Sequence, residues 1–340
     1  MAISEAPEAE VYERTRPLLL GLAYRMLGSV SEAEDVVQEA FVRYHTAAGS
    51  GEAIGSPKAY LATVTTRIAI DQLRSARVRR ERYVGQWLPE PLLTGVPTRP
   101  ATWSGLLGGP TEPGWSAGLA GGSEVERYAE FNESLSMAFL VVLERLSPAE
   151  RAVFVLREVF EYPFAEIAGI VGRSEANVRQ IAVRARRHIN EGRPRFELNR
   201  SEQAELAGRF FAALRDADLA GLLSTLSVDV TVVGDGGGKA PAVAEPVSGR
   251  ERVARFLLGL ARLGARLGLE LREVEVNGGP GALATDLQGR LASVLVLEIA
   301  GGSVRSIRSV ANPDKLRHLG PVVNVGDLLK AAGNQPGARS

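Results

Sequence analysis

Polar side chains suited to contacting DNA recur between residues 173 and 187. They are Arg173, Asn177, Arg179, Gln180, Arg184 and Arg187. Arginine and glutamine can each make two hydrogen bonds to a base edge in the major groove, and the other arginines suit phosphates. The set therefore predicts a DNA-contacting surface. The alternative is an ordinary amphipathic helix with a solvated basic face.

A helix-turn-helix predicted over Tyr162–Asn190 would position these side chains. Gly172 supplies the turn, and Ser174 is a natural N-cap for a helix that begins at Glu175. Apolar residues at helical spacing form the buried faces of the two helices, namely Phe164, Ile167, Ala168 and Val171, then Val178, Ile181, Ala182, Ala185 and Ile189. Two preceding helices, one at Glu126–Arg145 and one capped by Ser147, Pro148 and Glu150, complete a four-helix DNA-binding unit that ends at Pro194.

Composition limits the classes of function open to the chain. Its 340 residues and 45% apolar content allow two or three folded domains, and the 40 basic residues balance the 40 acidic ones. No cysteine and only three separated histidines are present, so we expect no metal site and no cofactor. No apolar run long enough to span a membrane occurs, so we expect a cytoplasmic protein without a membrane partner.

Three helices are predicted in the first hundred residues. They cover Val11–Leu27, a stretch with a capping box of Ser31 and Glu34 that runs to about Tyr44, and a helix that Ser56 and Pro57 open and that runs to roughly Arg79. The second helix carries the polar residues Asp35, Gln38 and Glu39, which could simply be solvated. The third carries Thr65, Thr66, Arg67, Asp71, Arg74 and Arg77. This third set suits unpaired bases and phosphates, unless it is only the charged side of a core helix.

The rest of the chain consists of a linker and an α+β domain. Residues 94–123 are rich in Gly, Pro, Ser and Thr and lack periodicity. Beyond Pro194, we predict helices at Ser201–Ala217, Leu219–Leu226 and Arg250–Leu263. Strands are predicted at Val228–Val233, Leu269–Val276, Gly281–Leu287, Leu291–Ile299 and Val304–Val310. Helices followed by antiparallel strands are typical of an α+β domain.

The order of these segments resembles the extracytoplasmic-function (ECF) sigma factors of bacterial RNA polymerase. The resemblance covers Leu18 to about Ile189 apart from the linker, which looks longer than is usual in that family. The last third resembles the SnoaL-like members of the NTF2-like cone fold. The motifs WLPEP, DGGGK and NPDKL resemble the SigJ-type subgroup, in which a SnoaL-like domain is fused to the sigma factor. Each motif is weak by itself, but the three in this order are specific.

The resemblance implies a multidomain fold and assigns the segments. Two all-α modules, a region 2 bundle (1–86) and a region 4 helix-turn-helix (125–195), flank a linker with WLPEP (87–124). An α+β SnoaL-like or NTF2-like cone (196–319) and a C-terminal tail (320–340) follow.

The resemblance also implies partners and sites. Asp35, Gln38 and Glu39 would bind the coiled coil of the largest subunit of core RNA polymerase. Thr65, Thr66, Arg67, Asp71, Arg74 and Arg77 would contact the minus-10 element of promoter DNA. The minus-35 element would be contacted by Arg173, Ser174, Asn177, Arg179, Gln180, Arg184 and Arg187.

The C-terminal domain leaves several hypotheses open. A cone pocket could bind a small ligand, which would favour a ligand-sensing DNA-binding regulator, or it could catalyse a reaction. Catalysis is disfavoured because the domain has one histidine and its aspartates lack an evident acid–base partner, so we expect no catalytic residues. The segment Asp235–Lys239 lacks the phosphate-loop spacing and is either a simple turn or a docking loop.

The preferred hypothesis is regulation in cis, without a separate anti-sigma protein. The expected interdomain residues are Trp87, Leu88, Pro89, Glu90, Pro91, Asp235, Gly236, Gly237, Gly238, Lys239, Asn312, Pro313, Asp314 and Lys315.

Overall fold

The computed structural model describes residues 8–51, 53–81, 83–94, 135–190, 200–243 and 245–333, and the chain forms two compact units. The first, called the helical unit, contains the described residues up to Glu81 together with Leu135 and residues 139–190. The second, called the sheet unit, contains residues 83–94, Ser136–Ala138 and the described residues from 200 onward. Each unit is considered by itself.

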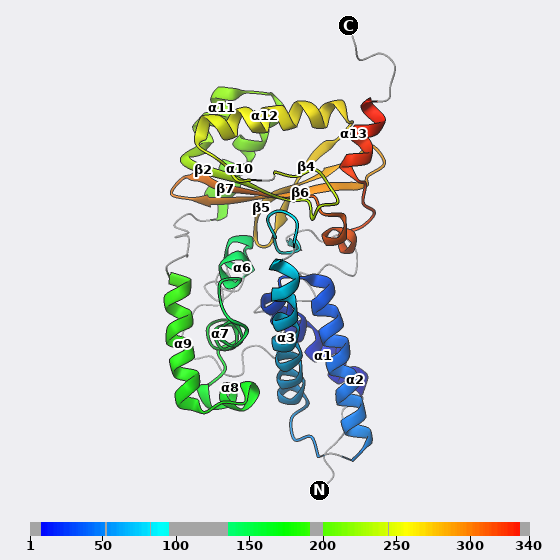
Figure 1. Cartoon of the computed structure of the whole chain (residues 1–340), viewed down its shortest axis with the longest axis vertical. Helices are drawn as coiled ribbons and strands as arrows, with labels where there is room; N and C mark the ends of the chain where they lie inside the picture. The colour runs from blue at the N-terminus through cyan, green and yellow to red at the C-terminus, as the bar shows by residue number, and fades with distance from the viewer. Residues whose placement is uncertain are drawn as a thin grey trace. The chain divides into compact units, whose positions relative to one another are not determined.

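The helical unit begins with three long helices, shown in blue to cyan in Figure 1. They are α1 (Glu8–Leu27), α2 (Val30–Gly49) and α3 (Pro57–Glu81), and each contacts the other two. The helix cap predicted at Ser31 is wrong. Ser29 has the extended backbone of an N-cap, and its side chain accepts a hydrogen bond from the backbone N–H of Glu32, so α2 starts two residues earlier than predicted.

The second half of the helical unit holds the helix-turn-helix. Its elements are α6 (Met137–Leu143, whose first two residues belong to the sheet unit), α7 (Pro148–Phe154), a π-helical turn η1 (Val155–Val159), α8 (Phe164–Val171) and α9 (Glu175–Asn190). The predicted cap of Ser147 and Glu150 is present as a reciprocal capping box. Gly172 adopts φ 66°, the left-handed conformation that ends α8 and makes the turn. The start of the helix predicted at Glu126 lies outside the described residues.

The sheet unit contains a seven-stranded sheet in the order β1-β4-β5-β6-β7-β2-β3. Its strands are β1 (Leu93–Thr94), β2 (Leu226–Asp235), β3 (Val247–Ser248), β4 (Glu270–Val276), β5 (Gly279–Thr285), β6 (Leu291–Ala300) and β7 (Ser303–Val310). All neighbours pair antiparallel except β2 and β7, which pair in parallel. The expectation of purely antiparallel strands is therefore wrong at this one pairing.

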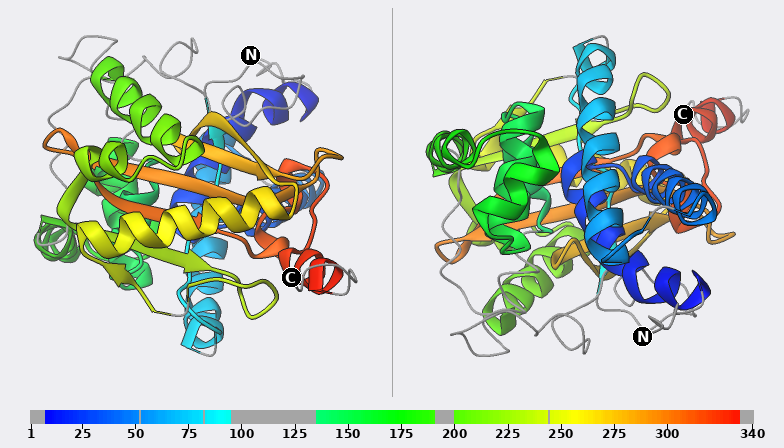
Figure 2. Two further views of the ribbon diagram at one scale, coloured as in Figure 1. Left: turned by 90° about the horizontal axis from the view of Figure 1, so that it is seen from above. Right: turned by 90° about the horizontal axis from the view of Figure 1, so that it is seen from below.

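Three helices supply the apolar layer of the sheet unit, namely α10 (Arg200–Arg215), α11 (Leu219–Thr225) and α12 (Arg250–Arg266). Figure 2 shows α12 lying across the strands. Phe210 and Phe211 of α10 and Leu257 of α12 are buried against inward-facing residues of the sheet such as Val230 and Ile307. This burial fixes which face of each strand is covered by helices.

Two boundaries differ from those expected. Residues 87–94, expected to begin a linker, belong to the sheet unit, where β1 forms the edge strand next to β4. After two 3-10 turns, η2 (Pro313–Lys315) and η3 (Arg317–Leu319), the chain pairs Val322 with Leu291 and forms helix α13 (Val325–Gly333). The segment expected to be a tail thus contains ordered structure up to Gly333.

Candidate functional surfaces and a buried ionic cluster

Helix α9 separates a buried face from a basic outer face. Val178, Ile181 and Ala185 are buried, as the spacing predicts. Arg173, Arg179, Gln180, Arg184 and Arg187 are exposed, and Asn177 is half-buried. Ser174 accepts a hydrogen bond from the N–H of Asn177 at 3.3 Å and so serves as the N-cap.

Some arginines of α9 are already engaged with neighbouring side chains. Arg179 pairs with Glu175 at 2.5 Å, and its guanidinium lies 4.7 Å from the ring centroid of Phe164. Arg184 lies 3.7 Å from a carboxylate oxygen of Glu150. Both pairs involve exposed arginines, so breaking them to bind DNA costs little.

Helix α3 offers fewer exposed side chains than its sequence suggests. Thr65 and Thr66 are fully buried, and Thr66 donates a hydrogen bond to the carbonyl of Ala62. Neither hydroxyl is exposed to solvent in this conformation, and their expected contact with DNA stays a prediction.

The remaining members of that set are distributed differently along α3. Arg67 donates hydrogen bonds to two carbonyls of α8. Asp71 and Arg74 are exposed and pair with each other at 2.9 Å. Arg77 lies in the last part of α3, where the side chains are outside the described residues. Among the described members of the set, the exposed ones are therefore Arg67, Asp71 and Arg74.

The polar residues of α2 lie on its outer face. Asp35, Gln38 and Glu39 are exposed, and Glu39 pairs with Arg43 at 2.8 Å. One turn further along the same face, Val42 is 61% exposed. Sequence reasoning missed Val42, because an apolar residue in an amphipathic pattern is normally assigned to the core.

In the sheet unit, Asp235 is the centre of a buried ionic cluster, defined here as Tyr83, Leu88, Asp235, Asn312 and Lys315. The Asp235 carboxylate is fully buried. It accepts hydrogen bonds from the Tyr83 hydroxyl (2.5 Å), the Leu88 backbone N–H (2.8 Å) and the Lys315 ammonium (2.7 Å). Three donors, one of them charged, offset much of the cost of burying a carboxylate.

Lys315 joins the segment that precedes β1 to the end of the sheet. Its side chain is 8% exposed, and its ammonium also donates to the Leu88 carbonyl at 2.5 Å. The ammonium lies 4.2 Å from the Trp87 ring and 4.8 Å from the Tyr83 ring, so both aromatic rings contribute cation–π attraction. Burial, together with the hydrogen bond to Asp235, raises the pKa of Tyr83 far above its ordinary value, which keeps the hydroxyl protonated as a donor.

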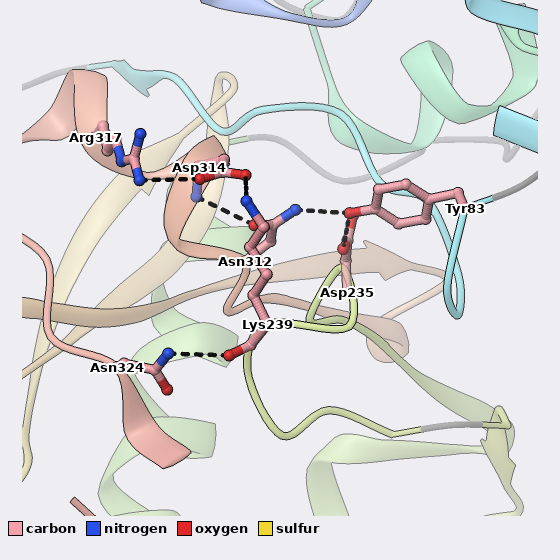
Figure 3. A network of polar contacts seen from close by, with 7 residues as sticks. All are labelled: Tyr83, Asp235, Lys239, Asn312, Asp314, Arg317 and Asn324. Atoms are coloured by element: carbon pink, nitrogen blue, oxygen red, sulfur yellow. Dashed lines mark hydrogen bonds and ion pairs between the residues drawn. The ribbon is translucent and has the colours of Figure 1, made fainter. Parts of the chain in front are cut away.

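The glycine run Gly236–Gly238 allows the loop after β2 to approach this cluster, as Figure 3 shows. Gly237 has φ 58°, and a Cβ there would lie 2.2 Å from Nδ2 of Asn312 and 2.9 Å from the Tyr83 hydroxyl. The same Asn312 amide donates to the Tyr83 hydroxyl at 2.8 Å. These glycines are thus explained by close packing and need no phosphate ligand.

Lys239, which follows the glycines, ties the loop to two other segments. Its ammonium pairs with Asp314 of η2, and its backbone carbonyl accepts a hydrogen bond from Asn324 at 2.9 Å (Figure 3). Asp314 also pairs with Arg317 at 3.1 Å, and Pro313 occupies the first position of η2, which Asn312 caps. The DGGGK and NPDKL motifs therefore form one connected site.

The rest of the WLPEP motif is buried against the end of the sheet. Pro89, Glu90 and Pro91 are buried, and His318 hydrogen-bonds the Pro91 carbonyl at 2.8 Å while its other ring nitrogen lies 3.9 Å from Glu90. Burial lowers the pKa of His318, although the Pro91 hydrogen bond and the Glu90 charge oppose the shift. The neutral imidazole is therefore favoured.

Two participants escaped sequence reasoning. Asn277, with φ 53°, accepts a hydrogen bond from the Leu92 N–H at 3.0 Å and donates its own N–H to the Leu92 carbonyl. Tyr83 lies outside the three motifs, and only its position just before Trp87 could have suggested it. We call residues 83–94, which all these contacts hold, the strap.

Metal-ligand groups and membrane-spanning helices are absent from the described part of the chain. No group of three or more His, Asp and Glu side chains there could hold a metal ion. None of the described helices is both long and apolar enough to cross a membrane. Asp286, one of the aspartates considered for catalysis, pairs with Arg290 at 2.7 Å and caps its own turn.

Comparison with known proteins matches this arrangement. The family model Sigma-70 region 2 matches residues 11–79, and the model Sigma-70, region 4 matches residues 136–189. The chain is 37% identical over 342 residues to the ECF RNA polymerase sigma factor SigJ of Mycobacterium tuberculosis, covering 98% of each. The crystal structure of that SigJ aligns with a TM-score of 0.68 at 36% identity, over 91% of this chain and 98% of that chain.

A solved NTF2-like protein of Burkholderia xenovorans LB400 aligns with 35% of this chain and 96% of its own length, at 21% identity and a TM-score of 0.25. The fold class predicted from sequence, two helical modules followed by a sheet domain, is confirmed by the element order and by the SigJ crystal structure.

Proposed function

Because the chain belongs to the extracytoplasmic-function family of RNA polymerase sigma factors, we propose that it is regulated in cis by its own sheet unit. As a sigma factor it binds core RNA polymerase and directs it to promoter DNA, and it is an initiation factor rather than an enzyme. The proposal concerns what controls that activity.

The ionic cluster is the observation that carries this proposal. The strap lies in sequence between the two sigma regions. The match to region 2 ends at residue 79, and the match to region 4 begins at residue 136. Asp235 and Lys315 hold that strap to the end of the sheet. Docking therefore fixes one part of the only covalent connection between regions 2 and 4. Release of the strap lengthens the free connection and so changes how the two regions can be placed on a promoter.

The surfaces of the two sigma regions take the following roles in the proposal. Asp35, Gln38 and Glu39 bind arginines on the coiled coil of the largest polymerase subunit, with Val42 adding an apolar contact beside them. Arg67, Asp71 and Arg74 contact the minus-10 element, and Thr65 and Thr66 join them after the two threonines are uncovered. The exposed side of α9 contacts the minus-35 element in the major groove.

Regulation in cis makes a separate anti-sigma protein unnecessary. In this proposal the protein acts in the cytoplasm, together with the polymerase. A small ligand in the sheet unit would fit the same scheme if it altered strap docking. Such a ligand would shift the equilibrium between docked and undocked strap only to the extent that it binds one of these two states more tightly than the other.

The test is in vitro transcription by core polymerase with the full chain and two glycine variants. Gly237→Ala introduces a Cβ that collides with Asn312, whereas Gly302→Ala, at a similar φ of 68°, meets no atom within 4 Å. We expect Gly237→Ala to change promoter-dependent output at unchanged core binding, and Gly302→Ala to behave like the parent chain.

Identical output from both glycine variants would refute regulation through the strap. Duplex DNA binding without any polymerase-dependent initiation would instead favour a ligand-sensing regulator.

A further inference from the structure

Helix α12 of the sheet unit has a buried apolar side and a basic outer side. It contains five arginines and a single acidic residue, Glu251. Val253 and Leu257 point into the core of the unit, where both are buried. Because 3.6 residues make one turn, positions 252, 255, 259, 262 and 266 share the other side of the helix. Four of these positions hold exposed arginines, which we call the arginine stripe: Arg252, Arg255, Arg262 and Arg266.

Most of the charge on the stripe has no counter-ion in the described part of the chain. Arg255 pairs with Glu251 at 2.9 Å, but Arg252, Arg262 and Arg266 form no ion pair with any described residue. Five arginines elsewhere in the sheet unit do pair with a carboxylate, namely Arg215, Arg290, Arg305, Arg308 and Arg317. The stripe is therefore a local concentration of uncompensated positive charge.

Helix stability does not account for the stripe. Arg252 lies in the first turn of α12, where the helix dipole disfavours a cation. Like charges three or four residues apart on a helix repel each other, and Arg252 with Arg255 and Arg262 with Arg266 are two such pairs. A polyanion bound along the stripe would remove this repulsion.

The length of the stripe fits the backbone of duplex DNA. From Arg252 to Arg266 the helix rises about 21 Å at 1.5 Å per residue. Phosphates of one DNA strand follow each other about every 3.4 Å along the duplex axis, so roughly six of them face a stripe of this length. As a sigma factor, the chain lies beside duplex DNA whenever it directs polymerase to a promoter.

A membrane surface fits the stripe less well. A basic helix that lies on a membrane inserts its apolar face among the lipids. The apolar face of α12 is instead covered by the sheet, across which the helix lies in Figure 2. Among the described leucines of α12, Leu260 alone is exposed, at 44%. Too little apolar surface is free for insertion.

We propose that the arginine stripe of α12 binds the phosphate backbone of duplex DNA and so gives the sheet unit a DNA contact of its own. Arginines that contact phosphates position a protein on DNA without reading its sequence. The stripe therefore adds affinity to promoter binding, while selectivity stays with the two sigma regions. The proposal rests on the sigma-factor function and does not require regulation through the strap.

The test measures how promoter affinity depends on salt. Holoenzyme is formed from core polymerase and the full chain, and its affinity for a promoter with flanking duplex is measured between about 50 and 200 mM salt. Each lost phosphate contact reduces the slope of log affinity against log salt by about 0.9, so Arg252→Gln with Arg262→Gln should reduce the slope by about 1.8. Over this fourfold range of salt, the parent should lose about twelvefold more affinity than the variant.

This pair of substitutions should leave α12 intact. Neither arginine has an ion pair with a described residue, and glutamine has nearly the helix propensity of arginine. The matched control is Arg209→Gln with Arg272→Gln, which removes the same charge from exposed positions of α10 and β4. We expect the control to keep the parent's slope. Exchanging the base pairs outside the two promoter elements should not alter the difference between parent and stripe variant.

Three results would overturn the proposal. The first is an unchanged slope for the stripe variant in a chain whose circular dichroism shows native helix content. The second is an equal decrease in slope for the stripe variant and the control, which would reflect net charge alone. The third is weaker binding to core polymerase by the stripe variant, which would assign the stripe to the polymerase. If the slope is unchanged while binding to phosphatidylglycerol vesicles is lost, the stripe belongs to a membrane surface.

Discussion

Replacing Lys315 with methionine should release the strap, because it leaves the Asp235 carboxylate buried without its cation. Removing one member of a buried ion pair costs about 3–5 kcal/mol. Asp235 keeps the hydrogen bonds from Tyr83 and Leu88, so we expect the lower end of this range. About 3 kcal/mol corresponds to roughly a hundredfold decrease in the ratio of docked to undocked strap.

Trp87 provides the assay. The chain has three tryptophans, and Trp103→Phe with Trp115→Phe leaves Trp87 as the single emitter. Its ring lies against the Lys315 ammonium, so undocking should expose it to water and shift its emission to longer wavelength. Urea titrations followed at this wavelength give the free energy of undocking for each variant.

A double-mutant cycle distinguishes charge compensation from simple loss of packing. Asp235→Asn combined with Lys315→Met removes both charges while keeping similar side-chain shapes. We expect the double variant to lose less than the sum of the single losses, because no unpaired charge remains buried. A loss of less than about 1 kcal/mol in the free energy of undocking for Lys315→Met would refute the ionic explanation of strap docking. A loss in the double variant equal to the sum of the two single losses would refute it as well.

Three further predictions concern pH and the outer surfaces. Burial lowers the pKa of His318, so the contribution of this residue to strap docking is fully present above its ordinary pKa of 6.5 and is lost as the pH falls through the lowered value. Trp87 emission should therefore show weaker docking at pH 5 than at pH 7. His318→Gln should flatten this dependence of docking on pH. Arg187→Ala should weaken promoter binding by the holoenzyme and reduce the slope of log affinity against log salt by about 0.9 if one phosphate contact is lost. An unchanged slope would argue against a phosphate contact by Arg187. Asp35→Ala with Glu39→Ala should weaken core polymerase binding roughly tenfold at low salt, whereas equal affinity would show that the partner binds elsewhere.

Local sequence patterns were enough to predict the helix-turn-helix. Gly172 and Ser174 mark a turn and a cap, and the spacing of Val178, Ile181 and Ala185 identifies the buried face of α9. The same logic placed the α2 cap two residues late. Both Ser29 and Ser31 can cap a helix, and local sequence does not distinguish them.

Contacts between distant residues were less accessible. The parallel pairing of β2 with β7 joins strands separated by about seventy residues, and no periodicity within either strand specifies its partner. Arg67 was predicted to face DNA because arginine on a helix surface suits phosphates. Its bonds to carbonyls of α8, more than a hundred residues later, depend on packing that sequence spacing does not encode.

The ionic cluster also sets the order in which the molecule can assemble during synthesis. Lys315 follows Leu88 by 227 residues, so the ribosome must add these 227 residues after Leu88 before the hydrogen bond between Lys315 and Leu88 can form. At about 5–20 residues per second, this takes roughly 10–45 seconds. Both sigma regions have left the ribosome before then, so each nascent chain passes through an interval in which the two regions exist without a completed sheet unit.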